Sequence, residues 1–395
     1  MSETLTTTTA DGASASGNPH LTADDPAALV GAYAEQLIGM LGGATELLTI
    51  ELGRRFGLYR ALHEHGPVSA ARLAAIAGIA PRYAREWLEQ QAAAGHIGVT
   101  EEGAAERRFL LPELHVPVLL DETHPAHAAP VAGLLAGVAL AFPELVADFR
   151  LGRGVAFDEY GAELRHGLGA LNRPGYLLAM RAWVEQLPDR AAALDAGGTV
   201  LDAGCGVGWS TIGLAMAFPN ARIVGVDLDE ASITEARENA VDAGVADRVE
   251  FVLGNAADPG AVERAAAASP RGAADGVGAA SGFDLVTVFE ALHDMGRPIH
   301  ALAGFRTLLR PGGALLVADE RVADEFHADA EPVERMLYAM SVLHCLPATT
   351  AESGTIANGT VLRPPTLRRW AAEAGFGRVD VLDIEHPFWR FYRIG

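Results

Sequence analysis

Apolar residues follow two different patterns along the chain, and the pattern changes near residue 182. Before that point they repeat at helical spacing, as in residues 46–63, where six large apolar side chains share one helical face. After it, short apolar runs alternate with longer helical segments. Strands that alternate with helices are typical of a parallel sheet covered on both faces. The sequence therefore predicts a helical N-terminal half and an α/β C-terminal half.

The N-terminal half predicts a winged-helix domain. We expect helices over residues 26–44, 46–63, 69–76 and 81–94, followed by short strands at residues 97–100 and 107–111. Gly66-Pro67 ends the second helix, Ser69 is placed to cap the third, Gly78 ends it, and Pro81 begins the fourth. Helices followed by two strands around an acidic turn describe a winged helix.

The segment that follows predicts more helices. Its apolar run, residues 128–143, is 16 residues long and contains glycine and proline, so it is short for a membrane span. We expect a buried or dimer-facing helix there and no membrane contact. Residues 1–25 are rich in Thr, Ala, Ser and Asp and lack the cationic start and apolar core of a signal peptide. They predict a disordered tail.

The C-terminal half predicts a sheet of seven strands. We place them at residues 199–202, 222–226, 249–253, 283–289, 314–318, 378–382 and 388–394. Residues 265–282, rich in Gly, Ala and Ser, predict a mobile insertion between the third and fourth strands. The expected domains are a tail at 1–25, a winged-helix and dimerisation domain at 26–118, a helical linker at 119–180 and the sheet domain at 181–395.

The sequence TVLDAGCGVGWS, residues 199–210, joins the first strand to a glycine turn and a helix. Three glycines alternate along the turn, at Gly204, Gly206 and Gly208. Asp202 precedes them, Cys205 stands where a small residue is needed, and Ser210 is expected to cap the helix at 211–217. Because backbone N–H groups point outward at a helix N-terminus and glycine lets a ligand approach closely, this turn predicts a site for part of a nucleotide-like ligand.

The spacing of the turn separates two classes of ligand. A dinucleotide-binding turn has the pattern G-x-G-x-x-G, and its third glycine would fall at Trp209, which is too large for that role. The pattern G-x-G-x-G preceded by Asp202 resembles motif I of the class I, Rossmann-like, S-adenosylmethionine (SAM)-dependent methyltransferases. SAM has an amino-acid tail and a sulfonium in place of a pyrophosphate, so an acid beside the turn suits it chemically.

The resemblance implies further cofactor-binding residues at the ends of the strands. Asp227 follows the second strand, 25 residues after Asp202, where a carboxylate can accept hydrogen bonds from both ribose hydroxyls. The other expected contacts are Cys205 in the turn and Leu228, Asn255, Ala256, Phe289 and Glu290 after the second, third and fourth strands. Methyltransferases of this kind also have antiparallel last strands, and their linker helices close over the cofactor as a lid.

The residues after the fourth strand resemble those of plant-type small-molecule O-methyltransferases. These enzymes carry a His-Asp pair there whose histidine is the general base, and His293-Asp294 matches it, although Met295 replaces their usual tryptophan. An imidazole has a suitable pKa to take a proton from a hydroxyl acceptor. Asp294 or Glu320 could orient the ring. Two other histidines are weaker candidates: His300 and His344.

The charge balance limits the partners. The chain has 51 acidic residues against 30 basic ones, all of them arginine, for a net charge of -21. Residues 45–110 contain eight arginines and eight acidic residues, so the winged-helix domain is neutral. A neutral domain is poorly suited to DNA phosphates. We therefore expect homodimerisation through the N-terminal half and no nucleic-acid partner, with a winged-helix transcriptional regulator as the alternative.

These observations predict a cytoplasmic enzyme. Two distant cysteines and scattered histidines indicate neither a disulfide framework nor a metal site. The predicted reaction is transfer of a methyl group from SAM to a small-molecule acceptor, with O-methylation favoured because of His293 and S-adenosylhomocysteine (SAH) as product. N- or C-methylation stays open, and an NAD-dependent oxidoreductase is the competing enzyme class that Trp209 disfavours.

Overall fold

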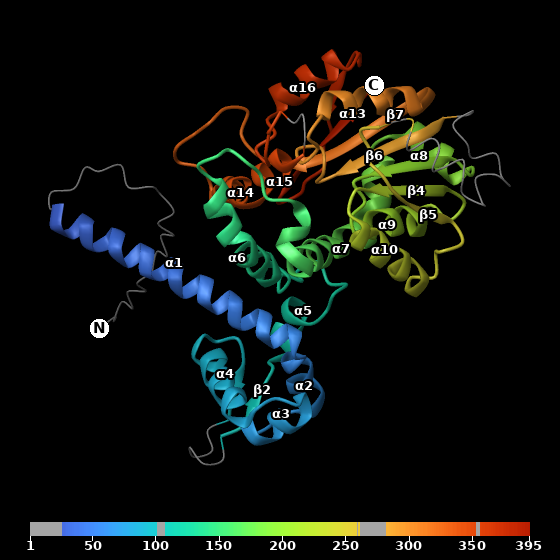
Figure 1. The fold of residues 1–395 in the computed structure, drawn as a ribbon. Helices are drawn as coiled ribbons and strands as arrows, with labels where there is room; N and C mark the ends of the chain where they lie inside the picture. Colours follow the sequence, from blue (N-terminus) through green and yellow to red (C-terminus); the bar gives the residue numbers. More distant parts are fainter. Residues whose placement is uncertain (1–25, 101–106, 259, 261–281, 353–355) are drawn as a thin grey trace, which may run out of the picture.

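The structure, a computed structural model, describes residues 26–100, 107–258, 260, 282–352 and 356–395. The expected tail and nearly all of the expected insertion lie outside these residues. A winged-helix domain at the N-terminal end is joined by long helices to a helix-covered sheet (Figure 1). The described residues therefore form the helical and α/β halves that the sequence predicts.

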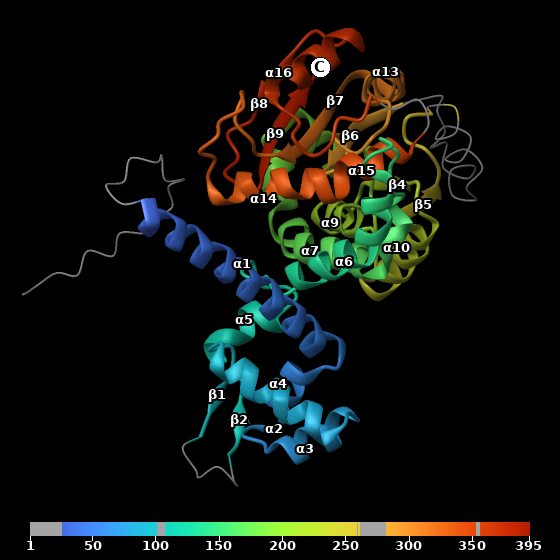
Figure 2. The same cartoon turned by 60° about the vertical axis from the view of Figure 1, so that its left-hand side comes forward.

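The winged-helix domain has the expected elements. They are α1 Pro26–Arg55, α2 Leu58–His65, α3 Ala70–Ala77, α4 Pro81–Ala93, β1 Gly98–Val99 and β2 Phe109–Leu110. The Ser69 hydroxyl accepts from the Arg72 backbone N–H, Gly78 takes a left-handed conformation at the end of α3, and Pro81 begins α4. β1 and β2 pair antiparallel and form the wing at the far end of the molecule (Figure 2).

The break expected after residue 44 is wrong. A single helix, α1, runs through to Arg55, and the chain bends at Gly57, which has a φ of 61°. Thr45 lies inside this helix, and its hydroxyl donates to the Leu41 and Gly42 carbonyl oxygens of the preceding turn. The left-handed conformation at Gly57 is favourable for glycine, and it is this residue that separates α1 from α2.

Long helices link this domain to the sheet. They follow the short elements η1 Glu113–His115 and α5 Val116–Leu119 and comprise α6 Val131–Asp148, η2 Phe157–Tyr160, α7 Gly161–Glu185 and α8 Pro188–Asp195. α6 is long and apolar enough to span a membrane by length and composition, but it packs against α1 and α7 in this fold and 39% of it is buried. α7 crosses the expected domain boundary at residue 180 without a break.

The seven strands form one sheet in the order β5-β4-β3-β6-β7-β9-β8. Their bounds are β3 Thr199–Ala203, β4 Arg222–Asp227, β5 Val249–Leu253, β6 Phe283–Phe289, β7 Leu309–Glu320, β8 Val379–Val381 and β9 Trp389–Ile394. β3 to β7 are parallel, and β9 runs antiparallel to both β7 and β8, as the resemblance implies. β7 begins five residues earlier than expected and extends to Glu320.

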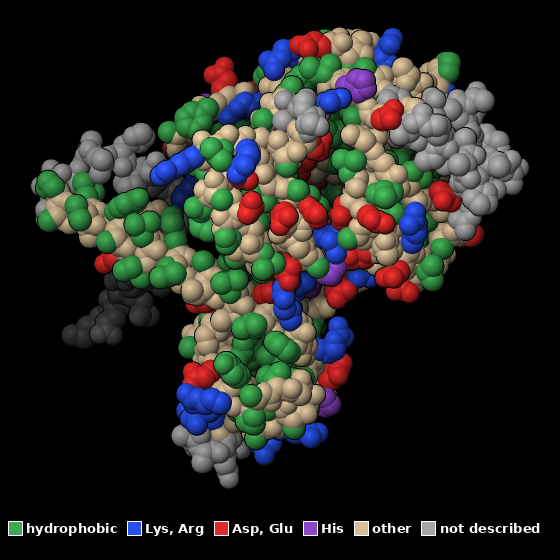
Figure 3. All heavy atoms as spheres, in the orientation of Figure 1, with side chains coloured by type: hydrophobic (Ala, Val, Ile, Leu, Met, Phe, Trp, Pro, Cys, Tyr) green, Lys and Arg blue, Asp and Glu red, His purple; other side chains and the backbone are tan. Residues whose placement is uncertain are grey.

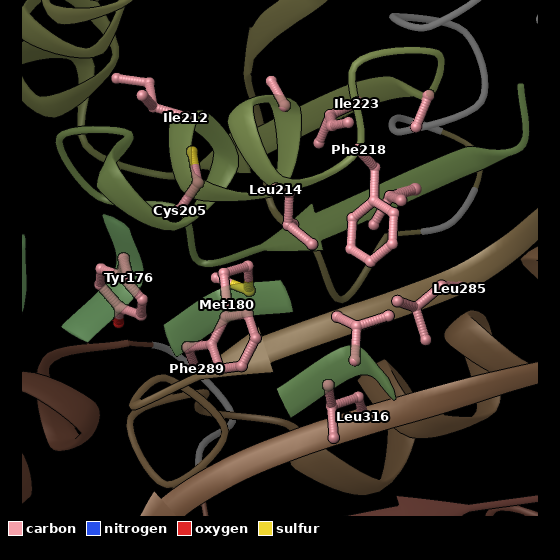
Figure 4. Close-up of a cluster of buried hydrophobic side chains, with 14 of the residues drawn as sticks. Tyr176, Met180, Cys205, Ile212, Leu214, Phe218, Ile223, Leu285, Phe289 and Leu316 are labelled. Carbon is pink, nitrogen blue, oxygen red and sulfur yellow. The ribbon is translucent and has the colours of Figure 1, made fainter. Parts of the chain in front are cut away.

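Helices cover both faces of this sheet. They are α9 Trp209–Ala217, α10 Glu230–Asp242, α13 Pro298–Leu308, α14 Pro332–Met340, the π-helical turn η3 Ser341–Cys345, α15 Leu346–Ala351 and α16 Pro364–Glu373. Alternate strand residues enter separate cores: Val200 joins the α7 to α10 side, shown in Figure 4, and Leu201 joins the α13 and α16 side. The parallel strands thus end at one edge, where β3 and β6 lie side by side.

Candidate active site

The glycine turn follows β3 in a conformation that favours glycine. Gly204, Gly206 and Gly208 have φ values of 75°, 50° and 87°, all in the left-handed region. At Gly208 an added Cβ would lie 2.8 Å from the Ala236 Cβ, whereas at Gly206 it would meet nothing within 4 Å. Gly208 therefore permits close packing of the turn on α10, and Gly206 leaves the open side on which a ligand can approach.

Asp202 and Ser210 form a buried hydrogen-bonding group behind this turn. Ser210 does not cap α9; Gly208 occupies the cap position, and the Ser210 hydroxyl donates to Asp202 Oδ2 at 2.6 Å. Thr211 and Thr287 donate to the same carboxylate at 2.7 and 2.8 Å, and Asp202 is 1% exposed. The carboxylate therefore holds β3, α9 and β6 together, a role that the sequence did not suggest for it.

Asp227 lies half-buried at the end of β4, beside the turn. Its Oδ2 accepts from the Gly206 backbone N–H at 2.7 Å, and its Oδ1 accepts from the Asp229 N–H at 2.9 Å. Burial raises the pKa of this carboxyl, and these backbone donors act in the opposite direction. Because each carboxylate oxygen has a further lone pair, Asp227 keeps the capacity to accept from ribose hydroxyls.

The remaining expected cofactor residues differ in accessibility. Leu228 is 53% exposed beside Asp227 and offers an apolar surface to an adenine ring. Asn255 is exposed, but its Oδ1 accepts from the Ala257 N–H and so holds its own turn, while Ala256 is buried. Phe289 packs inside the core against Tyr176 (Figure 4), so its side chain supports the site from behind.

His293 is held between two carboxylates on the loop after β6. Its Nδ1 lies 2.9 Å from Asp319 Oδ1, at the end of β7, and its Nε2 lies 3.3 Å from Asp294 Oδ1. The imidazole is 2% exposed. The loop is adjacent to the glycine turn, because a Cβ at Gly204 would lie 2.5 Å from the Ala291 Cβ. The structure thus brings the expected His-Asp pair to the cofactor turn.

The carboxylates determine the charge of His293. Burial by itself would lower its pKa, but the charges of Asp294 and Asp319 and their hydrogen bonds outweigh burial and raise the pKa well above 6.5. Asp319 is the ring partner that the sequence did not identify; Asp294 and Glu320 were the expected candidates. A carboxylate acceptor at Nδ1 favours the tautomer in which the neutral ring has its free lone pair at Nε2.

Glu290, which is half-buried, and Glu320, which is buried, form a second acidic pair next to His293. Asn172 of α7 donates to Glu290, whose φ of 53° is left-handed and strained for a residue other than glycine. Burial and the charge of Glu290 raise the pKa of Glu320 well above its usual range. Glu290 therefore contacts α7 and Glu320, and it forms part of the wall of the site.

Two residues of the π-helical turn η3 complete this region. His344 is 3% exposed, burial lowers its pKa, and its ring packs edge-on against Tyr160 at 4.7 Å. Cys345 places its Sγ within 4.8 Å of donor atoms of His293 and Asp294, the geometric arrangement of a metal site that sequence spacing did not predict. Burial raises the pKa of Cys345 to about 12, so the thiol is protonated at neutral pH. We therefore assign the cluster of His293, Asp294 and Cys345 to hydrogen bonding and not to a metal ion.

The other weak candidate, His300, is exposed on α13.

Comparisons with known proteins agree with the two domains of this fold. A family model for methyltransferase domains matches residues 194–363, and one for Rv2258c-like winged HTH domains matches residues 44–120. Ubiquinone biosynthesis O-methyltransferase of Stutzerimonas stutzeri is 26% identical over 200 residues, which are 50% of this chain and 73% of the relative.

Solved structures share the whole fold. The mitomycin 7-O-methyltransferase MmcR has a TM-score of 0.63 at 21% identity, over 93% of this chain and 99% of its own. Human N-acetylserotonin methyltransferase, solved with SAM, has a TM-score of 0.65 at 16% identity, over 94% of this chain and 98% of its own. The two family matches show that the chain carries a methyltransferase domain and an N-terminal winged-helix domain, and the solved structures show that it has the fold of SAM-dependent methyltransferases.

Proposed function

We propose that this enzyme methylates a hydroxyl group of a small aromatic or polyketide-like acceptor, with His293 as the general base. The observation that carries the proposal is the buried imidazole beside the cofactor turn, with Nδ1 2.9 Å from Asp319 and Nε2 3.3 Å from Asp294. This arrangement supplies an oriented proton acceptor, which a hydroxyl needs because it is a weak nucleophile until it loses its proton.

The chain's own residues would divide the work as follows. Bound SAM supplies an electrophilic methyl group on a positively charged sulfur. The glycine turn, Asp227 and Leu228 bind and orient the cofactor, His293 takes the acceptor proton at Nε2, and Asp319 holds the ring and stabilises the imidazolium that forms. The buried walls keep water from competing with the acceptor.

The relatives support a hydroxyl acceptor without deciding it. Ubiquinone biosynthesis and mitomycin 7-O-methyltransferases are named for O-methylation. The same fold also includes a riboflavin-derivative N,N-dimethyltransferase, at 17% identity and a TM-score of 0.55. We favour oxygen because an amine at neutral pH in its free-base form needs no general base, whereas an unactivated hydroxyl does.

We further propose that the winged helix serves dimerisation in a cytoplasmic enzyme and not DNA binding. On α4, Arg82 and Arg85 pair with Glu86 and Glu89 one turn later, so the helix that would enter a DNA groove is neutralised. This arrangement disfavours the transcriptional-regulator alternative.

The long helix α1 supports dimerisation. It projects away from the other elements with apolar side chains on its surface (Figures 1 and 3). Its large exposed apolar residues are Val30, Tyr33, Leu37, Ile38, Met40, Leu41, Leu48 and Leu52. Between residues 26 and 45, Glu35 is the single charged residue, so this stretch has no polar face to turn to water. A second copy of the chain is the partner that we propose to cover it.

Substitution of the base tests the reaction. We expect His293→Ala to lower turnover roughly 10²- to 10⁴-fold, the usual contribution of a general base, while SAM binding measured by calorimetry stays unchanged. The assay is SAH formation with a panel of phenols. His300→Ala, which changes an exposed histidine on α13, is the matched control and should keep full activity. Full turnover by His293→Ala would refute the general-base role.

The raised pKa of His293 predicts the pH dependence. A base must be neutral to accept a proton, so kcat should rise as pH increases from neutral through the raised pKa. Asp294→Asn removes one of the charges that raise this pKa, and the rising limb should therefore move to lower pH. The measurement is a pH–rate profile, with Asp242→Asn, an exposed change on α10, as control. An unmoved limb in Asp294→Asn would contradict the assignment.

Asp227 tests the cofactor assignment. Its replacement by Ala removes both the ribose acceptor and the bond to the Gly206 N–H, and we expect SAM affinity to fall at least tenfold. Calorimetry measures the change, and Asp242→Ala is the matched control. Equal affinity in Asp227→Ala and the wild type would remove the ribose contact from the site.

Two charges on α1 test the dimer. We expect the double variant Ile38→Glu and Leu41→Glu to be monomeric by light scattering, because a dimer would bury both charges in an apolar interface. Val241→Glu places one charge at an exposed apolar position of α10 and should leave the dimer intact. A monomeric wild-type enzyme would refute the proposal directly.

A further inference from the structure

The middle of α7 lies directly on the cofactor turn. A methyl group at Gly169 would overlap the Val207 side chain, so only a glycine allows this approach. One helical turn later, the Arg173 guanidinium stacks over the Trp209 ring, 4.1 Å from its centroid. Residues four apart share one face of a helix, so this face of α7 covers the turn and the first residue of α9.

Only some of the hydrogen-bond donors of the Arg173 guanidinium have a partner among the described residues. Its Nη1 donates to Glu122 Oε2 at 2.6 Å, and its Nε is buried without a hydrogen-bond partner among the described residues. The Arg173 side chain is 25% exposed and that of Glu122 is 54% exposed. Glu122 lies on the segment between α5 and α6, outside the sheet domain. The Arg173 guanidinium, which lies beside the glycine turn, thus forms an ion pair with one carboxylate of the helical linker, that of Glu122.

The cofactor brings a carboxylate of its own to this end of the crevice. The methionyl tail of SAM carries an α-carboxylate, and the N-terminus of α9, which begins at Trp209, favours negative charge. A guanidinium binds carboxylates through two parallel N–H groups, a geometry that a single bond to Glu122 does not fill. The stacking on Trp209 fixes the plane of this guanidinium next to the helix end.

We propose that Arg173 binds the α-carboxylate of SAM and that Glu122 occupies its guanidinium in the free enzyme. Glu122 is then a carboxylate latch that the cofactor displaces from the Arg173 guanidinium. The exchange is favourable because an exposed ion pair contributes little to stability, whereas the cofactor carboxylate gains the helix terminus as well. This inference rests on the cofactor site proposed above.

Three ligands distinguish binding of the amino-acid tail from binding of the rest of the cofactor. SAM and SAH carry the amino-acid tail, whereas 5′-methylthioadenosine has the adenosine and sulfur without it. Calorimetry on the full-length enzyme should show that Arg173→Met weakens SAM and SAH at least tenfold and leaves 5′-methylthioadenosine unchanged. Glu122→Gln removes the competing carboxylate and should tighten SAM and SAH about two- to fivefold, the range of an exposed ion pair, again without effect on 5′-methylthioadenosine.

The chain offers a closely matched control. Arg181, also on α7, stacks on the Phe218 ring at 5.0 Å and pairs with Asp195, but it lies away from the glycine turn. Arg181→Met should bind all three ligands as the wild type does. Equal weakening of all three ligands by Arg173→Met would show a general structural role and overturn the carboxylate contact. Unchanged SAM affinity in Glu122→Gln would overturn the latch. If the wild type bound none of the three ligands, the proposed cofactor site itself would be refuted. That result differs from those that overturn the Arg173 contact or the Glu122 latch.

Discussion

The buried carboxylate of Asp202 is the constraint on which the site depends. Its oxygens accept from Ser210 and Thr211 at the start of α9 and from Thr287 in β6. Hydrogen bonds to a charged group contribute about 1.5–3 kcal/mol each, and they offset the burial that raises the pKa of Asp202. One side chain thereby fixes the glycine turn against the strand that leads to His293. The proposed cofactor site and the proposed base are thus positioned by the same group.

Much of the fold could be predicted because strands that are buried on both faces occur in the sequence as short apolar runs. β5 and β6 have the expected bounds, residue by residue, since each is a short, mainly apolar run bounded by polar or glycine positions. The bend after α1 could not be predicted as readily. Gly42, Gly43 and Thr45 look like helix-ending residues, yet the helix continues, and the bend depends on a single glycine, Gly57, in a sequence that otherwise favours helix.

The site shows where sequence reasoning stops. His293-Asp294 and Asp227 follow strands, so their position at the carboxyl edge follows from topology. The choice between Asp319 and Glu320 does not, because adjacent strand residues point to opposite faces and only the register of β7 against β6 decides which reaches the imidazole. Cys345 lies 52 residues beyond His293, and a π-helical turn brings it there. Residues of that kind carry no local signal.

Four acidic residues around one imidazole give the site a definite electrostatic preference. The charges of Asp294 and Asp319 raise the pKa of His293, and burial together with the charge of Glu290 raises that of Glu320. Such a field stabilises cations in a buried space: the imidazolium of His293, and a sulfonium relative to the uncharged thioether that remains after methyl transfer. The donor is cationic and the product is not. On the proposed assignment, the same carboxylates that orient His293 therefore favour binding of the cationic donor over retention of the uncharged product.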